Sequence, residues 1–369
     1  MKLALALSGG GVRAMGFHLG VLGRLAHAGR LSEVTAVSSV SGGSLAVGLI
    51  LAHNDYRWPT DRQYLRRIVP RLSTLLTTTN LQRSYVVASI TRPWLLPVGH
   101  FARGRASLLG STLRRHWRID ATLSDLPAFP KLTFNATCYQ TGKNWRFERD
   151  VMGDYRAGYV RHPRFALSHA LAASAAVPGL IGPLTIDARR HRWSSAHDVD
   201  RPVRPPFRRL QLWDGGVYDN LGVEPLFKPG RGFAPEIDTL VVSDASRSIA
   251  DSPRRTRLRP GYLDASMRMV DIATDQVRSV RARTLINHFT AHPGSGVYLR
   301  LGRRSDDRSH LSGTTAPTPT PAEVQAAATL ETTLRRLAPA EFGRLFRHGY
   351  DVAEATIEKR LRSTVRHAA

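Results

Sequence analysis

A serine near the start of this sequence stands where a strand is expected to turn into a helix. Ser41 lies in the stretch AVSSVSGGSLAVG, in which an apolar β-branched run meets a run of small residues. A nucleophile elbow has this strand–turn–helix form and needs small residues two positions before and two positions after the serine. Ser39 and Gly43 stand at those positions. The stretch alone fits a serine nucleophile and, equally well, a serine that caps the helix.

A glycine-rich loop precedes this serine in the chain. The stretch SGGGVRA, residues 8–14, follows a short apolar run and precedes a helical pattern. Gly9, Gly11 and Ala14 match the G-x-G-x-x-G/A fingerprint of dinucleotide binding. That fingerprint also needs an acidic residue at the carboxyl end of the second strand, where this sequence has SSV at residues 38–40. A dinucleotide site is therefore the less favoured interpretation of the loop.

The same loop is better suited to holding an oxyanion. Glycine lets the backbone N–H groups of Gly10 and Gly11 approach an anion closely and adopt φ values that other residues avoid. The N–H of Gly42, at the start of the helix that follows Ser41, adds a further donor. We expect these donors to face the serine on the neighbouring strand.

A serine nucleophile also needs a base, and Asp214 is the best candidate. It ends the strand RLQLW and enters a turn at Gly215-Gly216, so its carboxylate is expected at the same sheet edge as Ser41. A carboxylate is a weak base toward an alcohol and works only when it is held within hydrogen-bond reach in a dry site. Asp-Gly is also a common turn pair, so a purely structural role stays open. The order Ser, Asp, His would allow a triad with His288, but no motif surrounds that histidine.

The elements that must position these residues alternate between strand and helix. Strands are expected over residues 2–7 and 33–40, and helices over residues 12–27 and 41–53. This alternation is typical of an α/β fold with a doubly wound, mainly parallel sheet. Residues 54–130 have a mostly helical pattern and are expected to form an insertion or covering layer.

The later parts of the chain divide into shorter units. In chain order, we expect a hairpin (131–149), a small-residue helix ended by Pro178-Gly179 and an exposed loop (187–209). A flexible segment (303–322) and two amphipathic helices (321–337 and 339–361) are expected to follow. We therefore expect a domain of residues 1–245 that carries the candidate site. Residues 246–369 are then a helical extension packed on it.

The composition is strongly basic. The 369 residues include 53 Lys and Arg against 29 Asp and Glu, a formal charge of +24, and nearly all of the positive charge is arginine. This excess fits attraction to phosphate on a nucleic acid or an anionic lipid surface, and equally a source genome that favours arginine codons. The arginines are spread along the chain without interleaved aromatics, so no specific nucleic-acid partner is expected. Cys138 is the single cysteine, which excludes an intramolecular disulfide and a cysteine-rich metal site.

No segment has the pattern of a signal peptide or a transmembrane helix. The apolar run at residues 3–7 is short and is followed by three glycines, and no stretch reaches about 20 apolar residues. We expect a cytoplasmic protein that also binds peripherally to a membrane. The segment SYVVASITRPWLLPVGHF, residues 84–101, is the best candidate for an interface, through Trp94, Leu95, Leu96 and Val98. A core or lid segment is an equally consistent interpretation.

Three stretches taken together resemble the patatin-like phospholipase family. SGGGVRAMGFHLGVL, AVSSVSGGSLA and LWDGGVYDNLG are similar to its glycine loop, elbow and Asp-Gly-Gly motif, and NATCYQTGK and ASAAVP are similar to segments between them. The resemblance covers most of residues 1–245 and implies a three-layer α/β/α fold with a mainly parallel central sheet. The sequence departs from the family pattern at Ser39 and Ala14, which replace glycines with other small residues.

The resemblance also implies roles for the candidate residues. Ser41 would be the nucleophile and Asp214 the general base of a dyad without histidine, and Gly9, Gly10, Gly11 and Arg13 would form the oxyanion loop. The implied reaction is hydrolysis of a lipid carboxylic ester through an acyl-enzyme, with no metal or cofactor. The partner would be a lipid or phospholipid at a membrane surface. A dinucleotide-binding oxidoreductase that uses residues 9–14, and a non-catalytic lipid-binding member of the same fold, are the alternatives.

Overall fold

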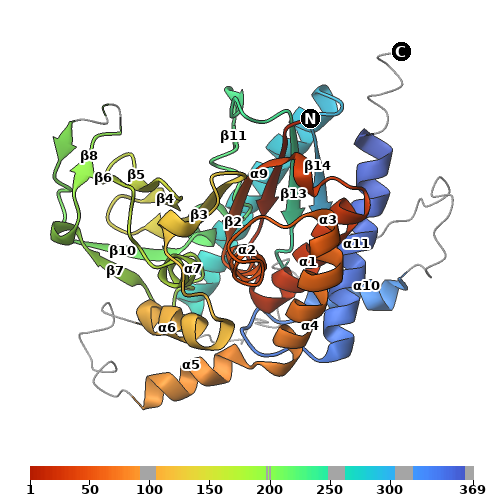
Figure 1. Cartoon of the computed structure of the whole chain (residues 1–369), viewed down its shortest axis with the longest axis horizontal. Helices are drawn as coiled ribbons and strands as arrows, with labels where there is room; N and C mark the ends of the chain where they lie inside the picture. Colours follow the sequence, from red (N-terminus) through yellow and green to blue (C-terminus); the bar gives the residue numbers. More distant parts are fainter. Residues whose placement is uncertain (92–104, 197, 199–200, 248–261, 304–318, 362–369) are drawn as a thin grey trace.

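The structure is a computed structural model that describes residues 1–91, 105–196, 198, 201–247, 262–303 and 319–361 (Figure 1). The strands are β1 (Leu3–Leu7), β2 (Val34–Val40), β3 (Lys131–Cys138), β4 (Lys143–Phe147), β5 (Val151–Asp154), β6 (Gly158–Arg161), β7 (Leu184–Asp187), β8 (Trp193–Ser194), β9 (Pro202–Val203), β10 (Arg209–Asp214), β11 (Phe227–Lys228), β12 (Gly232–Phe233), β13 (Thr239–Asp244) and β14 (Gly296–Arg300). The helices are α1 (Gly11–His27), α2 (Gly42–Ala52), α3 (Asp61–Gln63), α4 (Val69–Thr78), α5 (Leu81–Ile90), α6 (Arg105–Trp117), α7 (Leu167–Ser174), α8 (Gly216–Asp219), α9 (Tyr262–Ala291), α10 (Pro321–Thr329) and α11 (Pro339–Leu361).

One sheet of 12 strands organises the described residues, in the order β14-β13-β1-β2-β3-β4-β5-β6-β8-β9, and in addition β10 pairs with β3 and β7 pairs with β10. The strands from β14 to β3 are parallel. From β4 onward the sheet continues antiparallel. Helices cover both faces, so the fold is the three-layer α/β/α arrangement that the family resemblance implied, and its parallel central strands are those that the alternating elements predicted.

The sequence of β1 shows how the two faces are filled. Its five residues are all buried, and successive side chains of a strand point to opposite faces. Leu3, Leu5 and Leu7 enter the core shared with α1, α2 and α11, while Ala4 and Ala6 enter a second core that includes α9. The C-terminal helix α11 therefore packs on the same core as the first strands.

Residues after 245 contribute more to the sheet than the sequence pattern indicated. They form β14, which pairs in parallel with β13, and the 30-residue helix α9 on the second face. The helix expected over residues 321–337 ends at Thr329, and the loop expected over residues 187–209 contains β8 and β9. Residues 54–130 are mostly helical where described, and Trp94, Leu95, Leu96 and Val98 lie outside the described residues. None of the described helices combines the length and apolarity of a membrane span.

Candidate active site

Ser41 stands at the turn between β2 and α2 in a backbone conformation that few residues adopt. Its φ is +49° and its ψ is −117°. A non-glycine residue with positive φ is held there by its surroundings, and such residues cluster at functional sites. The Ser41 side chain makes no capping hydrogen bond to α2, although the residue occupies the N-cap position. The structure therefore removes the helix-cap explanation of this serine.

Small residues allow this turn to close, as the elbow frame predicted. A Cβ on Gly42 would lie 2.3 Å from the carbonyl oxygen of Gly11, and a Cβ on Gly43 would lie 2.4 Å from that of Leu7. The Gly43 N–H donates to the Ser8 carbonyl at 3.1 Å. The elbow and the glycine loop are thus in direct backbone contact.

Buried hydroxyl groups fix the elbow through hydrogen bonds. The backbone N–H of Ser41 donates to Ser174 Oγ at 3.0 Å, and Ser44 Oγ lies 2.8 Å from the same oxygen. Ser44 Oγ also donates to Ser39 Oγ at 3.1 Å. Ser39 therefore acts as more than a small spacer, because its hydroxyl joins this hydrogen-bond cluster.

The glycine loop leaves backbone donors beside the elbow. Gly10 has a φ of 141° and Gly11 a φ of 60°, values that favour glycine. Gly11 and Gly42 are the first residues of α1 and α2, so their N–H groups have no acceptor within the helix. Within the described part of the chain, no hydrogen bond is formed by the N–H of Gly10, Gly11 or Gly42. This set of donors matches the one expected to hold an oxyanion.

The loop is poorly suited to a dinucleotide. The N–H of Val12, in the first turn of α1, donates to the carbonyl of Thr333 at 3.0 Å. A Cβ on Gly11 would lie 2.4 Å from the same carbonyl oxygen. A pyrophosphate would need the space and the donors at this helix N-terminus. The loop around Thr333 therefore occupies part of the position that a dinucleotide requires.

Pairing of β2 and β10 with the same strand, β3, brings Asp214 to the turn that carries Ser41. Because β2 pairs with residues 131–135 of β3, and β10 pairs antiparallel with residues 136–138, the two strands lie in one row beside β3. They approach each other end to end, and Val40 pairs with Asn135 while Asp214 pairs with Ala136. The ends of the two strands therefore meet at the turn that carries the serine.

The Asp214 carboxyl group is buried and only partly satisfied. Its Oδ1 accepts the N–H of Gly216 at 2.7 Å, and Oδ2 has no hydrogen-bond partner among the described residues. Burial raises the pKa of Asp214 to about 6, against smaller lowering effects of the Gly216 N–H and the Ser41 hydroxyl. A carboxyl group with this pKa is ionised at neutral pH and is a stronger base than an exposed aspartate.

Asn220 is a site residue that the sequence analysis missed. Its carbonyl oxygen accepts the N–H of Gly9 at 3.1 Å, and its side-chain amide donates to Ser246 Oγ at 2.7 Å. A Cβ on Gly9 would lie 2.3 Å from Asn220 Oδ1, and a Cβ on Gly216 would lie 2.6 Å from it. The Asn220 amide therefore fills the space between the glycine loop and the Asp-Gly-Gly turn, and its only sequence signal was its place at the end of the stretch DGGVYDN.

Arg13, expected in the oxyanion loop, is turned away into the protein. Its guanidinium donates to the carbonyls of Leu330 and Ala245 at 2.7 and 3.0 Å. Burial and the nearby Arg247 lower its pKa to about 10. Arg13 thus ties the glycine loop to the end of β13 and to the loop after α10, and its guanidinium is not among the donors beside Ser41.

The histidines have other surroundings. His18 is fully buried, with Nδ1 2.7 Å from Ser243 Oγ and Nε2 2.9 Å from the Ser8 carbonyl oxygen, and burial lowers its pKa to about 4. His288, the third member of the alternative triad, packs near the C-terminal end of α9, with its ring 4.9 Å from that of Phe227. Neither arrangement offers a base to the serine.

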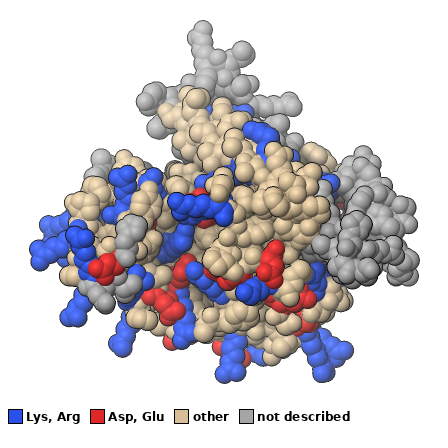
Figure 2. Space-filling model, turned by 90° about the horizontal axis from the view of Figure 1, so that it is seen from above, with Lys and Arg blue, Asp and Glu red and all other residues tan. Residues whose placement is uncertain are grey.

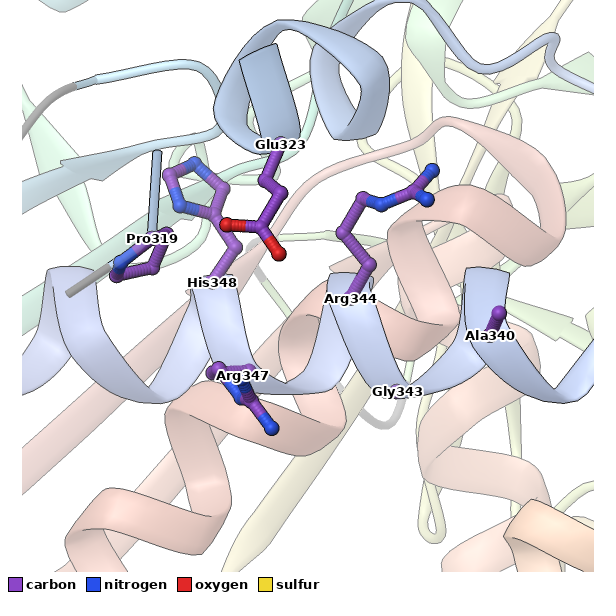
Figure 3. A pocket seen from close by; sticks show the side chains of 7 residues that line it. All are labelled: Pro319, Glu323, Ala340, Gly343, Arg344, Arg347 and His348. Carbon is purple, nitrogen blue, oxygen red and sulfur yellow. The ribbon is translucent and has the colours of Figure 1, made fainter. Parts of the chain in front are cut away.

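Two surface pockets lie apart from these residues. One, of about 280 Å³, lies between α10 and α11, where Figure 3 shows Glu323 pointing from α10 toward α11; it is lined by Pro319, Glu323, Ala340, Gly343, Arg344, Arg347 and His348. The other, of about 380 Å³, is lined by Ser107, Phe165, His169, Leu184, Thr185, Ile186, Asp187, Arg190, His191 and Arg209. Neither is lined by a residue of the serine and aspartate site.

Comparisons with known proteins agree with the fold of this chain. A family model described as patatin-like phospholipase matches residues 5–227. A structure of human GIVD cytosolic phospholipase A2 superposes with a TM-score of 0.56 at 17% identity, covering 99% of this chain and 60% of the other. The same enzyme with methyl gamma-linolenyl fluorophosphonate inhibitor and terbium chloride gives a TM-score of 0.50 at 16% identity, with the same coverage. The chain thus spans about 60% of the length of these proteins, and no curated protein sequence matches it.

Proposed function

The chain belongs to the patatin-like phospholipase family, and on that premise we propose that it hydrolyses carboxylic esters of lipids with Ser41 and Asp214 as a catalytic dyad. The observation that carries the proposal is the pairing of a positive-φ serine with a buried carboxyl group whose Oδ2 has no partner among the described residues. The similarity to solved phospholipases supports the fold, while the dyad rests on the geometry of this chain.

The first half of the reaction acylates the serine. Ser41 Oγ attacks the ester carbonyl carbon while Asp214 Oδ2 accepts the hydroxyl proton. The N–H groups of Gly10, Gly11 and Gly42 stabilise the negative charge that develops on the carbonyl oxygen. The tetrahedral intermediate collapses, and the alcohol leaves with the proton held by Asp214.

The second half releases the acid. Asp214, ionised again, takes a proton from a water molecule that attacks the acyl carbonyl carbon. The same backbone donors stabilise the second oxyanion, and Ser41 leaves with the proton. This chain's own groups supply the nucleophile, the base and the oxyanion donors at each step.

The proposed substrate is a membrane lipid or phospholipid. The basic surface would hold the protein on an anionic bilayer, where the concentration of ester is high. The family includes phospholipases by name, and this supports the choice of lipid over other esters.

Hydrolysis of p-nitrophenyl butyrate tests the dyad directly. Ser41→Ala and Asp214→Asn should each lower kcat/KM by at least about 10³-fold. Ser168→Ala, at an equally buried serine of α7, and Asp219→Asn, at a buried carboxylate of the same motif, are the matched controls and should retain activity. Activity retained in either dyad variant would refute the proposal.

A further inference from the structure

One helix beside the site exposes aliphatic side chains that nothing in the described structure covers. On α5, Val86, Val87 and Ile90 are 45%, 51% and 66% exposed. Leu81 and Tyr85, on the opposite side of the helix, are buried. The three exposed positions share one face, because residues three and four apart lie above one another on a helix. The helix thus has a buried face and a second apolar face directed outward.

The segment that contains this helix is unusual in its charge. Residues 62–119 include eleven arginines and no lysine, aspartate or glutamate, although the chain has 29 acidic residues. Arg83 is exposed on α5 and lies one turn before Val86 and Val87. Figure 2 shows the opposite end of the molecule, seen from above the view of Figure 1, and there acidic and basic side chains lie side by side. The excess of positive charge is therefore a property of the sequence of residues 62–119, the segment that contains α5.

Contacts place α5 at the same edge of the sheet as Ser41. The N–H of Gln82 donates to the Leu334 carbonyl at 3.0 Å, and the preceding residue, Thr333, packs directly on Gly11 of the glycine loop. The Tyr85 hydroxyl donates to the Ile181 carbonyl at 3.4 Å. Figure 1 shows α5 along the lower edge, toward which the arrows of β1, β13 and β14 point.

We propose that this outer face of α5 docks the protein on a bilayer that contains anionic phospholipid. Val86, Val87 and Ile90 enter the boundary between headgroups and acyl chains, and Arg83 stays among the phosphates. The docking would bring the edge with Ser41 against the lipid. The proposal extends the lipid hydrolase function proposed above, but it concerns binding and is tested without turnover.

A bilayer fits this surface better than a protein partner does. Stable protein interfaces bury roughly 800 Å² on each side, which is far more than three aliphatic side chains on one helix offer. A partner protein would also need a large acidic surface opposite the arginines. An anionic bilayer supplies dense negative charge and an apolar layer within about 5–10 Å of it, which are the two properties that this face requires.

Vesicle sedimentation of the full chain tests the proposal. The Ser41→Ala background prevents hydrolysis, and the vesicles are pure phosphatidylcholine or contain about one-third phosphatidylglycerol. We expect binding to the anionic vesicles at least about tenfold tighter than to the neutral ones. Val86→Ser, Val87→Ser and Ile90→Ser together should weaken that binding at least about tenfold, and Arg83→Gln should weaken it severalfold.

The control is a matched pair of exposed apolar residues on another helix. Val280→Ser and Ile286→Ser on α9, at residues 53% and 38% exposed, should change vesicle binding less than twofold. Unchanged binding of the triple variant, equal binding to neutral vesicles, or an equal loss in the α9 control would each overturn the proposal. Dimerisation that the triple variant abolishes, without vesicle binding, would overturn it in favour of a second copy of the chain.

Hydrolysis of a soluble ester distinguishes a failure of the docking surface from a failure of the catalytic dyad. With Ser41 intact, the triple variant should hydrolyse p-nitrophenyl butyrate like the unmodified chain, because α5 contributes no group to the dyad. Vesicle binding by the Ser41→Ala chain, with no ester hydrolysis by the unmodified chain, would refute the proposed function and leave the docking surface standing.

Discussion

Replacing Asp214 with asparagine is expected to stabilise the fold while removing the proposed base. The ionised carboxylate is buried, its Oδ2 has no hydrogen-bond partner among the described residues, and burial raises its pKa to about 6. Asparagine keeps an oxygen for the N–H of Gly216, which Asp214 Oδ1 accepts at 2.7 Å. The uncharged amide nitrogen of asparagine takes the place of Oδ2, the carboxylate oxygen that is buried without a hydrogen bond to compensate for lost hydration. The substitution therefore separates stability from activity.

The size of the gain follows from the shift in pKa. A carboxyl group with a pKa of about 6 in the folded chain and 3.8 when unfolded binds protons more tightly when folded. Its ionisation therefore lowers the free energy of unfolding as the pH rises from about 4 to about 6. Above that range the loss is complete and amounts to about 3 kcal/mol, at 1.36 kcal/mol for each pKa unit. Asp214→Asn should recover up to that amount at pH 8 and less than about 1 kcal/mol at pH 4.

Urea unfolding at both pH values measures this difference. Asp219→Asn is the control, since Asp219 is buried in the same motif but accepts the N–H groups of Leu221 and Glu224 at 3.1 and 2.9 Å and lies 3.8 Å from Arg281. Breaking those interactions should lower the stability at pH 8. An Asp214→Asn variant less stable than the unmodified chain at pH 8, or equally stabilised at pH 4, would refute this effect of the buried carboxylate.

Three further predictions concern the same site. The kcat/KM for p-nitrophenyl butyrate should fall below pH about 6, as Asp214 becomes protonated, and a pH profile flat down to pH 4.5 would contradict its role as base. Gly42→Ala should lower kcat at least about 10²-fold, because its Cβ would lie 2.3 Å from the Gly11 carbonyl oxygen, and a normal kcat in a folded variant would contradict the oxyanion assignment. Ser174→Ala removes the acceptor of the Ser41 N–H and should lower kcat more than it changes KM. It should also lower the free energy of unfolding by about 1 kcal/mol. A change in stability with unchanged kcat would show that Ser174 has only a structural role.

The parts of the site that could be predicted are those with local signals. Ser41 follows from the strand–turn–helix frame, and the free donors of Gly10, Gly11 and Gly42 follow from a loop that opens a helix. Asp214 was also found from its motif, but the sequence did not show how its strand reaches the turn that carries Ser41. Its strand lies antiparallel in the same row as β2, and no local pattern shows which strands share a row.

The residues that could not be predicted act through contacts distant in sequence. The Ser174 hydroxyl accepts the N–H of Ser41, which is 133 positions away in the sequence. The Arg13 guanidinium donates to the Leu330 carbonyl, which is 317 positions away. Residues 246–369 were expected to be a helical extension, but the bounds of α9 were not predicted, because Val270, Val277 and Val280 are exposed on its outer face and obscure the amphipathic period. The following strand β14 is only five residues long, and its place at the sheet edge depends on pairing with β13.

The central claim is that Ser41 is a nucleophile activated by Asp214 without a histidine. Peptide mass mapping after reaction with a fluorophosphonate tests it most directly, because this probe bonds covalently to an activated serine. We expect one adduct, on the peptide with Ser41, no labelling of Ser41→Ala, and labelling slowed at least about 10²-fold in Asp214→Asn. An adduct on another residue, or labelling of Asp214→Asn at the unmodified rate, would contradict it.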